Sequence, residues 1–199
     1  MSLKLRLASW WMPPSMKARE IERIRSLTFA VLDELLAEHA PGALSIEDDP
    51  QVGRLEERRA AMAKGHRRRV EALIRGVGRE KAIALGRASL RPVGEALGRD
   101  ARRRLGVGNT RRELLQAAGV MYDILGIEFT ISTGPDGDRL VVSRCALSSH
   151  YSKDVCAVLS AVDEGAVSGL NPEAEMLFRE HLTDGFPQCI AGISIKEER

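Results

Sequence analysis

Apolar residues recur every three or four positions over the first two thirds of the chain, which is the spacing of one face of an α-helix. The pattern predicts helices over residues 21–36, 51–75, 79–105 and 114–125. Pro41-Gly42 is expected to end the first helix, and Pro92 and Gly94 are expected to break the third. Thr110 and Glu113 have the spacing of a capping box, which predicts where the fourth begins.

Near residue 126 the apolar positions change to strict alternation, as in a half-buried strand. Residues 133–138 are rich in turn formers, so the sequence predicts a β-hairpin over residues 127–145. The elements expected after it are a helix over 152–169 and strands over 175–181 and 190–195. This order predicts an α+β fold, with N-terminal helices packed on a C-terminal α/β unit that contains a small antiparallel sheet.

These elements divide the chain into three expected parts. They are a flexible leader over residues 1–15, a helical part over 16–108 and an α+β domain over 109–199. In the leader, Trp10, Trp11 and Met12 form an apolar group that is either an upstream extension or a docking patch. Gly165 and Gly169 are spaced for close packing near the end of their helix.

Composition restricts the class of protein. Hydrophobic residues make up 44% and charged residues 29% of the 199 residues, enough for one domain or two small ones to bury a core. No apolar run approaches the roughly 20 residues that span a bilayer, so no membrane partner is expected. The sequence lacks the features of a secretory signal, which favours a cytoplasmic protein. The first helix has apolar positions on more than one face, which favours a homo-oligomer.

The net charge of +2 hides a basic middle segment. Residues 51–112 hold 18 Lys and Arg against 6 Asp and Glu, whereas residues 113–199 hold 6 against 14. One interpretation is a nucleic-acid surface, and the other is long helices whose arginines dock on the acidic C-terminal part. No nucleic-acid motif accompanies the charge and only 4% of residues are aromatic, so no nucleic-acid partner is expected. His66 lies on one of these polar helices and is expected to be solvated.

The three cysteines lie near the C-terminus and are the main chemical candidates. Cys145, Cys156 and Cys189 are each expected at an element end, and with His181 they read Cys-x10-Cys-x24-His-x7-Cys. Three thiolates and an imidazole suit tetrahedral zinc, and three thiolates with an open position suit an iron–sulfur cluster. The spacing lacks close Cys-x2-Cys pairs, so the alternative is that the cysteines are small buried hydrophobic residues.

The C-terminal region also carries short motifs of a known family. They are Arg144-Cys145, Asp163-Glu164-Gly165, Gly169-Leu170-Asn171-Pro172, Arg179 and the run from Asp184 to Cys189. With these, roughly residues 110–195 resemble the L-2-amino-thiazoline-4-carboxylic acid hydrolase family and, more distantly, the 4-vinyl-reductase small-molecule-binding domain. In that domain a cysteine pair in the last hairpin helps to hold zinc, and His181 and Cys189 occupy the places of the pair.

The resemblance implies a metal-assisted hydrolase that opens a small ring containing sulfur and nitrogen, or an amidine-like bond. The alternative is a non-catalytic module that senses a metal and a small molecule. Both imply a small-molecule ligand and a metal, zinc or iron–sulfur, held by Cys145, Cys156, Cys189 and His181. The family's helix cysteine lies near Ser160, one turn after Cys156 and therefore on the same face.

Three further residues are candidates for catalysis. Asp163 is a candidate general base, His150 a candidate acid–base group, and Arg179 a candidate partner of a substrate carboxylate. Asp163 and Glu164 point about 100° apart on a helix, so their spacing does not make them a catalytic pair. The alternatives are a solvated helix end for Asp163, a surface loop for His150 and a surface ion pair for Arg179.

Overall fold

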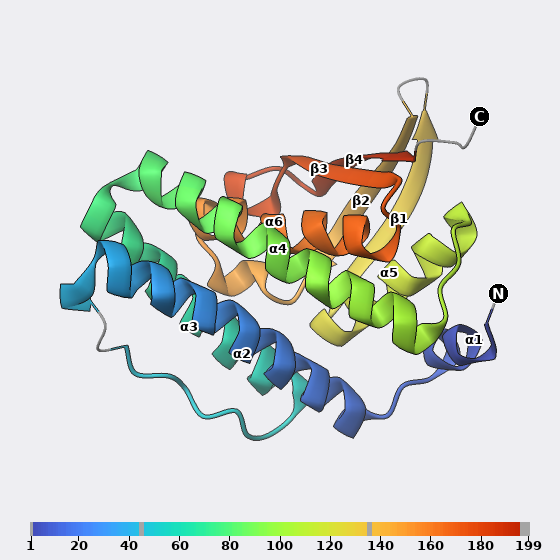
Figure 1. Ribbon diagram of the computed structural model, residues 1–199, viewed down its shortest axis with the longest axis horizontal. Coiled ribbons are helices and arrows are strands. Elements are labelled where there is room, and N and C mark those ends of the chain that lie inside the picture. Colours follow the sequence, from blue (N-terminus) through green and yellow to red (C-terminus); the bar gives the residue numbers. More distant parts are fainter. Residues whose placement is uncertain (1, 44–45, 135–136, 196–199) are drawn as a thin grey trace.

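Helices form most of the structure, and a small sheet joins them near the C-terminal end (Figure 1). The computed structural model describes residues 2–43, 46–134 and 137–195. The helices are α1 (Leu3–Trp10), α2 (Pro14–His39), α3 (Leu55–Val77), α4 (Arg79–Leu105), α5 (Arg111–Leu125) and α6 (Lys153–Leu170). The strands are β1 (Ile127–Gly134), β2 (Gly137–Cys145), β3 (Ala174–Glu180) and β4 (Cys189–Ile195). The α+β fold predicted from the sequence is confirmed.

Gly126 is the junction between the last helix of the N-terminal part and the sheet. It adopts a left-handed φ of 71°, a conformation that glycine takes readily and that commonly ends a helix. β1 and β2 form the first predicted hairpin, and β3 and β4 form the second. The strand order is β1-β2-β4-β3 and every pair is antiparallel. The tip of the first hairpin, residues 135 and 136, lies outside the described residues.

α6 lies between the sheet and α4 (Figure 1). Four glycines let the backbones of α4 and α6 touch. Cβ atoms added at Gly94 and Gly98 would lie 2.0 and 2.2 Å from carbonyl oxygens of α6. Cβ atoms at Gly165 and Gly169 would each lie 2.2 Å from a carbonyl oxygen of α4. No side chain fits at such distances, so the close packing predicted at Gly165 and Gly169 is confirmed.

α4 is one continuous helix, although the sequence predicts a break near Pro92 and Gly94. Pro92 removes one backbone hydrogen bond, but its fixed φ is compatible with a helix. Gly94 does not end the helix because its missing side chain is what admits α6 at this point. The same contact recurs one turn later at Gly98. The predicted break is therefore wrong.

The first fifteen residues, expected as a flexible leader, contain α1 and the start of α2. The hydroxyl of Ser2 accepts a hydrogen bond from the backbone N–H of Leu5 at 3.2 Å and donates one to the carbonyl of Leu105 at the end of α4. Leu5 is fully buried, which fixes α1 to the body of the protein. Within the described part of the chain, no helix is both long and apolar enough to cross a membrane.

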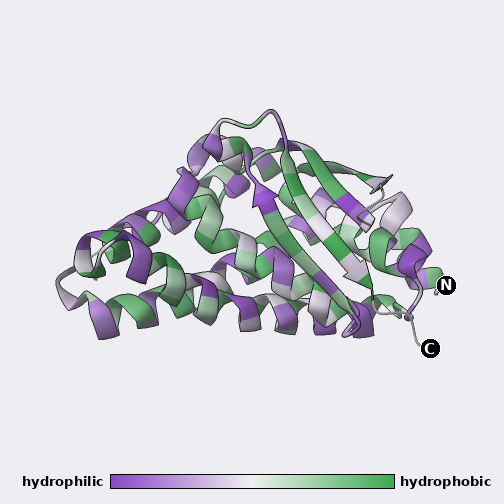
Figure 2. Cartoon of the chain, turned by 90° about the horizontal axis from the view of Figure 1, so that it is seen from above, coloured by the Kyte–Doolittle hydropathy of each residue, from purple (hydrophilic) through white to green (hydrophobic). Residues whose placement is uncertain are grey.

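Figure 2 shows the apolar positions in green. The buried ones form three clusters that share some of their partly buried neighbours. The first lies between the sheet and helices α5 and α6, the second joins α2, α3, α4 and α6, and the third joins α2 and α3 to the segment after β2. Cys145 packs against the first and third clusters, and Tyr151 packs against the second and third. The first and third clusters therefore meet beside Cys145, one of the predicted site residues.

The glycine contact generates a stability prediction. We expect Gly98→Ala to lower the free energy of unfolding by about 3 kcal/mol, because the new Cβ forces α4 and α6 apart. Gly119→Ala is the matched control, since no atom lies within 4 Å of its Cβ position and alanine favours the helix by about 0.5–1 kcal/mol. Urea unfolding of both variants measures the difference. Equal stabilities would contradict the backbone contact.

Candidate functional site

One face of α6 supplies the polar side chains of a pocket. Cys156, Ser160 and Asp163 are spaced i, i+4 and i+7, so they form a single line along the helix, and all three line the pocket. Cys156 and Ser160 are one turn apart on this face. The opposite side of α6 carries the glycines that meet α4.

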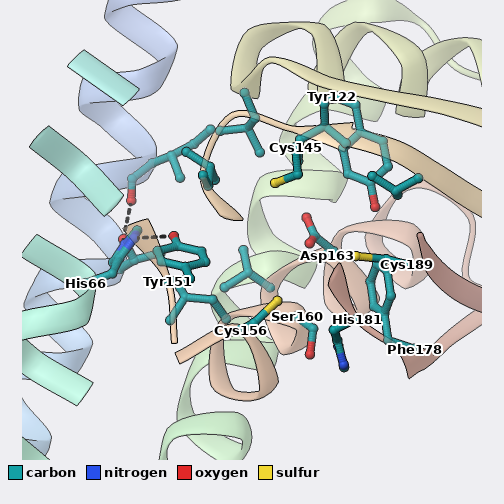
Figure 3. A pocket seen from close by; sticks show the side chains of 18 of the residues that line it. His66, Tyr122, Cys145, Tyr151, Cys156, Ser160, Asp163, Phe178, His181 and Cys189 are labelled. Atoms are coloured by element: carbon teal, nitrogen blue, oxygen red, sulfur yellow. Dashed lines mark hydrogen bonds between the residues drawn. The ribbon is translucent and has the colours of Figure 1, made fainter. Parts of the chain in front are cut away.

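The sheet and the segment after β3 bring the remaining candidates to the same pocket. Cys145 ends β2, Cys189 begins β4, and His181 follows β3. Figure 3 shows the side chains of Cys145 and Cys189 on either side of the Asp163 carboxyl group. The enclosed volume is about 80 Å³, enough for a few atoms. The three cysteines, His181 and Asp163 predicted from the sequence therefore all line one cavity.

Asp163 and its neighbour Glu164 have different environments. Glu164 is 1% exposed and pairs with the Arg87 guanidinium at 2.7 Å, so its charge is neutralised between α4 and α6. Within the described ranges Asp163 has no comparable cation, and the surface that it keeps accessible lines the pocket. Burial, reinforced by the charge of Glu164, raises the pKa of Asp163 to about 7. Asp163 is therefore the acid that can hold or release a proton near neutral pH.

The three thiols are held in their neutral form. Burial raises the pKa of Cys145 to about 11 and that of Cys156 to about 12. Burial also raises the pKa of Cys189, whose sulfur accepts a hydrogen bond from the N–H of Leu182 at 3.2 Å. A thiol of this kind packs as a small apolar group and is a poor nucleophile.

The side chains as placed do not fit the metal that the resemblance implies. Zinc needs four ligand atoms at about 2.0–2.3 Å, and an iron–sulfur cluster needs converging thiolates. Among the residues that the structure describes, no group of three or more His, Cys, Asp and Glu side chains is arranged to hold a metal ion. Nδ1 of His181 faces a carboxylate oxygen of Asp184 at 3.4 Å, and its Nε2 is buried with no hydrogen-bond partner among these residues.

Sequence reasoning missed Tyr122, which lines the pocket from α5. Its ring packs edge-on against Phe129, with ring centroids 5.2 Å apart. Burial raises the pKa of Tyr122 well above its usual value, and negative charge on Asp163 or Cys145 raises it further. Tyr122 therefore stays a neutral phenol beside the acid. In the sequence, a tyrosine in the apolar stripe of a helix is interpreted as a core residue. Its hydroxyl group is the one feature that indicates a role in binding.

His66 is buried, although the sequence predicts a solvated side chain. Its Nε2 lies 2.7 Å from Oγ1 of Thr28, and its Nδ1 lies 2.8 Å from the hydroxyl oxygen of Tyr151 (Figure 3). Because the Thr28 hydroxyl donates to the carbonyl of Ile24 at 2.8 Å, Nε2 of His66 donates to Thr28 and Nδ1 accepts from Tyr151. Burial lowers the pKa of His66 to about 3, so the ring is neutral. The prediction of a solvated His66 is wrong.

Two of the three catalytic candidates lie outside the pocket. Arg179 is exposed on β3 and lines a shallow depression on the outer face of the sheet with Arg139 and Glu180. The alternation of side chains along β3 explains this, because its neighbour Phe178 faces the pocket. His150 lies in the turn Ser148–His150 and is not among the residues that line the pocket. Of the three catalytic candidates, Asp163 therefore lies beside the thiols, whereas Arg179 and His150 do not.

A second, larger cavity of about 250 Å³ adjoins the first. The two cavities have Ile24, Tyr122, Leu125, Val162 and Asp163 in common. The rest of the larger cavity is lined mainly by apolar side chains of α2, α4, α5 and α6, with Glu20, Arg23 and Arg104 among its few charged residues. Together the cavities form an apolar chamber with a neutral polar wall at one end.

The basic segment pairs with carboxylates from the whole chain. Arg69 is 5% exposed and contacts Asp33 at 2.8 Å and Asp48 at 2.7 Å, while its guanidinium group lies over the ring of Phe29. Further pairs between segments are Arg104–Glu20, Arg68–Asp49, Arg79–Asp154 and Arg87–Glu164. The arginines dock on acids of α2 and of the turn before α3 as well as on the expected C-terminal part.

Comparisons with known proteins add little to this geometry. No family model matches the chain, and no curated protein matches it. Among solved structures, it is similar to a trafficking protein particle complex subunit 3 from Naegleria fowleri covalently bound to palmitic acid. The two are 14% identical, the match covers 71% of this chain and 97% of that one, and the TM-score is 0.48.

Proposed function

We propose that the protein is a small-molecule-binding module that takes a mostly apolar ligand with one hydrogen-bonding group. The observation that carries the proposal is the pair of adjoining cavities whose common wall contains Tyr122 and Asp163. Pockets for small molecules combine a largely apolar lining with a few polar groups that fix orientation. The apolar part of the ligand would occupy the larger cavity, and its polar group would meet Tyr122 and Asp163.

The volume limits the size of the ligand. An apolar cavity of about 150 Å³ is known to accept benzene, which has six non-hydrogen atoms. The larger cavity, at about 250 Å³, therefore accommodates a molecule of about ten such atoms. We expect the ligand to be neutral, because among the residues that the structure describes no cation pairs with Asp163, and the surrounding thiols hold their protons.

Hydrolysis of a small ring is a second candidate function. The observation that favours it is the pKa of Asp163, which at about 7 suits a general acid or base at neutral pH. Incubation with L-2-amino-thiazoline-4-carboxylic acid tests this candidate. Turnover that Asp163→Asn abolishes would support hydrolysis. If the wild-type protein does not turn over this compound, the hydrolase proposal is contradicted and ligand binding is the remaining proposed function.

Ligand binding is tested with 2-naphthol, which is fluorescent and carries one hydroxyl group on an apolar body. We expect it to bind about 5- to 10-fold more tightly than naphthalene, because a hydrogen bond in a buried site contributes about 1–1.5 kcal/mol. Ala118→Leu adds bulk to the larger cavity and should weaken binding at least about 10-fold, because it removes the space that the ring occupies. Ala88→Leu, on the exposed side of α4, is the control. Equal affinities for wild type and Ala118→Leu would contradict the proposed binding site.

The environment of Asp163 predicts a pH-dependent stability. The unfolded chain ionises this acid near pH 3.8 and the folded chain near pH 7, so its burial destabilises the protein increasingly as pH rises between these values. Asp163→Asn should therefore raise the free energy of unfolding at pH 8 by up to about 4 kcal/mol and change it little at pH 4. Urea unfolding at both values measures this. Asp123→Asn, whose side chain is 57% exposed, should change stability by less than about 1 kcal/mol at either pH.

The metal centre stays a prediction with its own test. Metal binding would require Cys145, Cys156 and Cys189 to lose their protons, so metal content should rise between pH 6 and pH 9. Each Cys→Ser variant should lose the metal, whereas Ser168→Ala should keep it. His181→Ala distinguishes a fourth ligand, whose removal costs the metal, from a residue beside an open position. Elemental analysis after dialysis measures the content. Equal metal in all these proteins would contradict a cysteine-held centre.

A further inference from the structure

One face of α1 is apolar and turned to solvent. Leu3, Leu7 and Trp10 are spaced i, i+4 and i+7, so they form one stripe, and they are 69%, 55% and 85% exposed. Trp11 continues the stripe at 65% exposure. Single exposed apolar residues are common on proteins, but two adjacent tryptophans beside two leucines form a patch of the kind that marks an interaction site. Leu5 is fully buried, so α1 is anchored while this stripe stays uncovered.

The apolar stripe is surrounded by positive charge. Residues 1–18 contain three Lys and Arg and no Asp or Glu. Lys4 and Arg6 are exposed on α1 itself, beside the stripe. The hydrogen bond from Ser2 to the last turn of α4 brings the start of α1 close to Arg103, whose side chain pairs with Asp100 at 3.0 Å and is 79% exposed. An occupant of this surface is therefore apolar where it meets the tryptophans and negatively charged around them.

The larger cavity lies next to this end of the molecule. Met12 and Met16, which follow α1 directly, both line the cavity, and Met16 is 50% exposed. Glu20 and Arg104 also line it and pair with each other at 2.7 Å, which joins α2 to α4 there. The exposed apolar surface thus continues from α1 to the margin of an apolar chamber.

We propose that α1 and Trp11 form a docking surface for a lipid bilayer with anionic headgroups. Tryptophan is enriched at the boundary between headgroups and hydrocarbon, where its ring is apolar and its N–H finds water. A short amphipathic helix can lie in that boundary with its apolar face inward and its cations among the headgroups, and it needs no spanning segment. An anionic bilayer offers its hydrocarbon boundary to the tryptophans and its negative headgroups to the exposed Lys4 and Arg6, so it matches both parts of the surface.

The protein provides its own probe for this surface. It contains two tryptophans, Trp10 and Trp11, so its tryptophan fluorescence reports on the proposed docking surface and on no other part. Full-length protein is titrated with vesicles of phosphatidylglycerol and, separately, of phosphatidylcholine. We expect the emission to shift to shorter wavelength with phosphatidylglycerol, with an apparent affinity at least about 10-fold higher than for phosphatidylcholine, since each cation near the surface strengthens binding.

Two double variants separate the apolar and the charged contributions. Leu3→Ser with Leu7→Ser should weaken binding to phosphatidylglycerol at least about 10-fold, because the apolar face is lost. Lys4→Glu with Arg6→Glu should remove the preference for phosphatidylglycerol over phosphatidylcholine. Leu177→Ser is the control, since Leu177 is 55% exposed on β3 and is not part of α1. All the substituted side chains are exposed, and circular dichroism checks that each variant is folded.

Two results would overturn the proposal. The first is an emission spectrum that does not change when phosphatidylglycerol vesicles are added in excess. The second is a blue shift that appears without vesicles as the protein concentration rises, which would mean that a second copy of the chain covers the stripe. Sedimentation at the same concentrations identifies that second case. Neither result bears on naphthol binding, so the two proposals are judged separately.

Discussion

The contact between α4 and α6 is the constraint on which the rest of the structure depends. At Gly94, Gly98, Gly165 and Gly169 the two backbones are so close that any side chain would meet a carbonyl group. This contact fixes the rotation of α6 about its own axis, because the glycines must face α4. The line of Cys156, Ser160 and Asp163 is therefore turned toward α5 and the sheet, where the pocket forms. The four glycines do not line the pocket, yet their contact determines which side chains of α6 line it.

The same rotation gives two adjacent carboxyl groups different chemistry. Glu164 faces α4 and pairs with Arg87, so its buried negative charge is compensated at the contact between the two helices. Asp163, one position earlier, faces a cavity lined by neutral groups, and its proton is retained to about pH 7. Adjacent residues point about 100° apart around the helix axis. This rotation places Glu164 in an ion pair and Asp163 in the pocket as an acid that can release its proton near neutral pH.

The sequence is informative where periodicity and spacing carry the signal. The hairpins, the α+β class and the close approach at Gly165 and Gly169 follow from alternation and glycine spacing. The gathering of the cysteines also follows, because Cys145 ends β2, Cys189 begins β4 and Cys156 lies in the first turn of α6. The fate of single polar residues does not follow, since it depends on partners far along the chain. His66 is buried because Thr28 and Tyr151 satisfy both ring nitrogens, and Tyr122 reaches the pocket because the crossing of α5 and α6 places it there.

Burial decides the chemical character of the pocket more than the identity of its residues does. Cysteine, aspartate and tyrosine are often charged in functional sites, yet here low solvent access keeps the thiols and the phenol protonated and raises the pKa of Asp163 to about 7. When Asp163 is protonated, such a pocket donates hydrogen bonds without carrying charge. A metal cation would have to displace several protons at once, whereas a neutral molecule displaces none. The balance of these costs favours a neutral ligand, and it makes Asp163, the group closest to releasing its proton at neutral pH, the residue through which pH can act on binding.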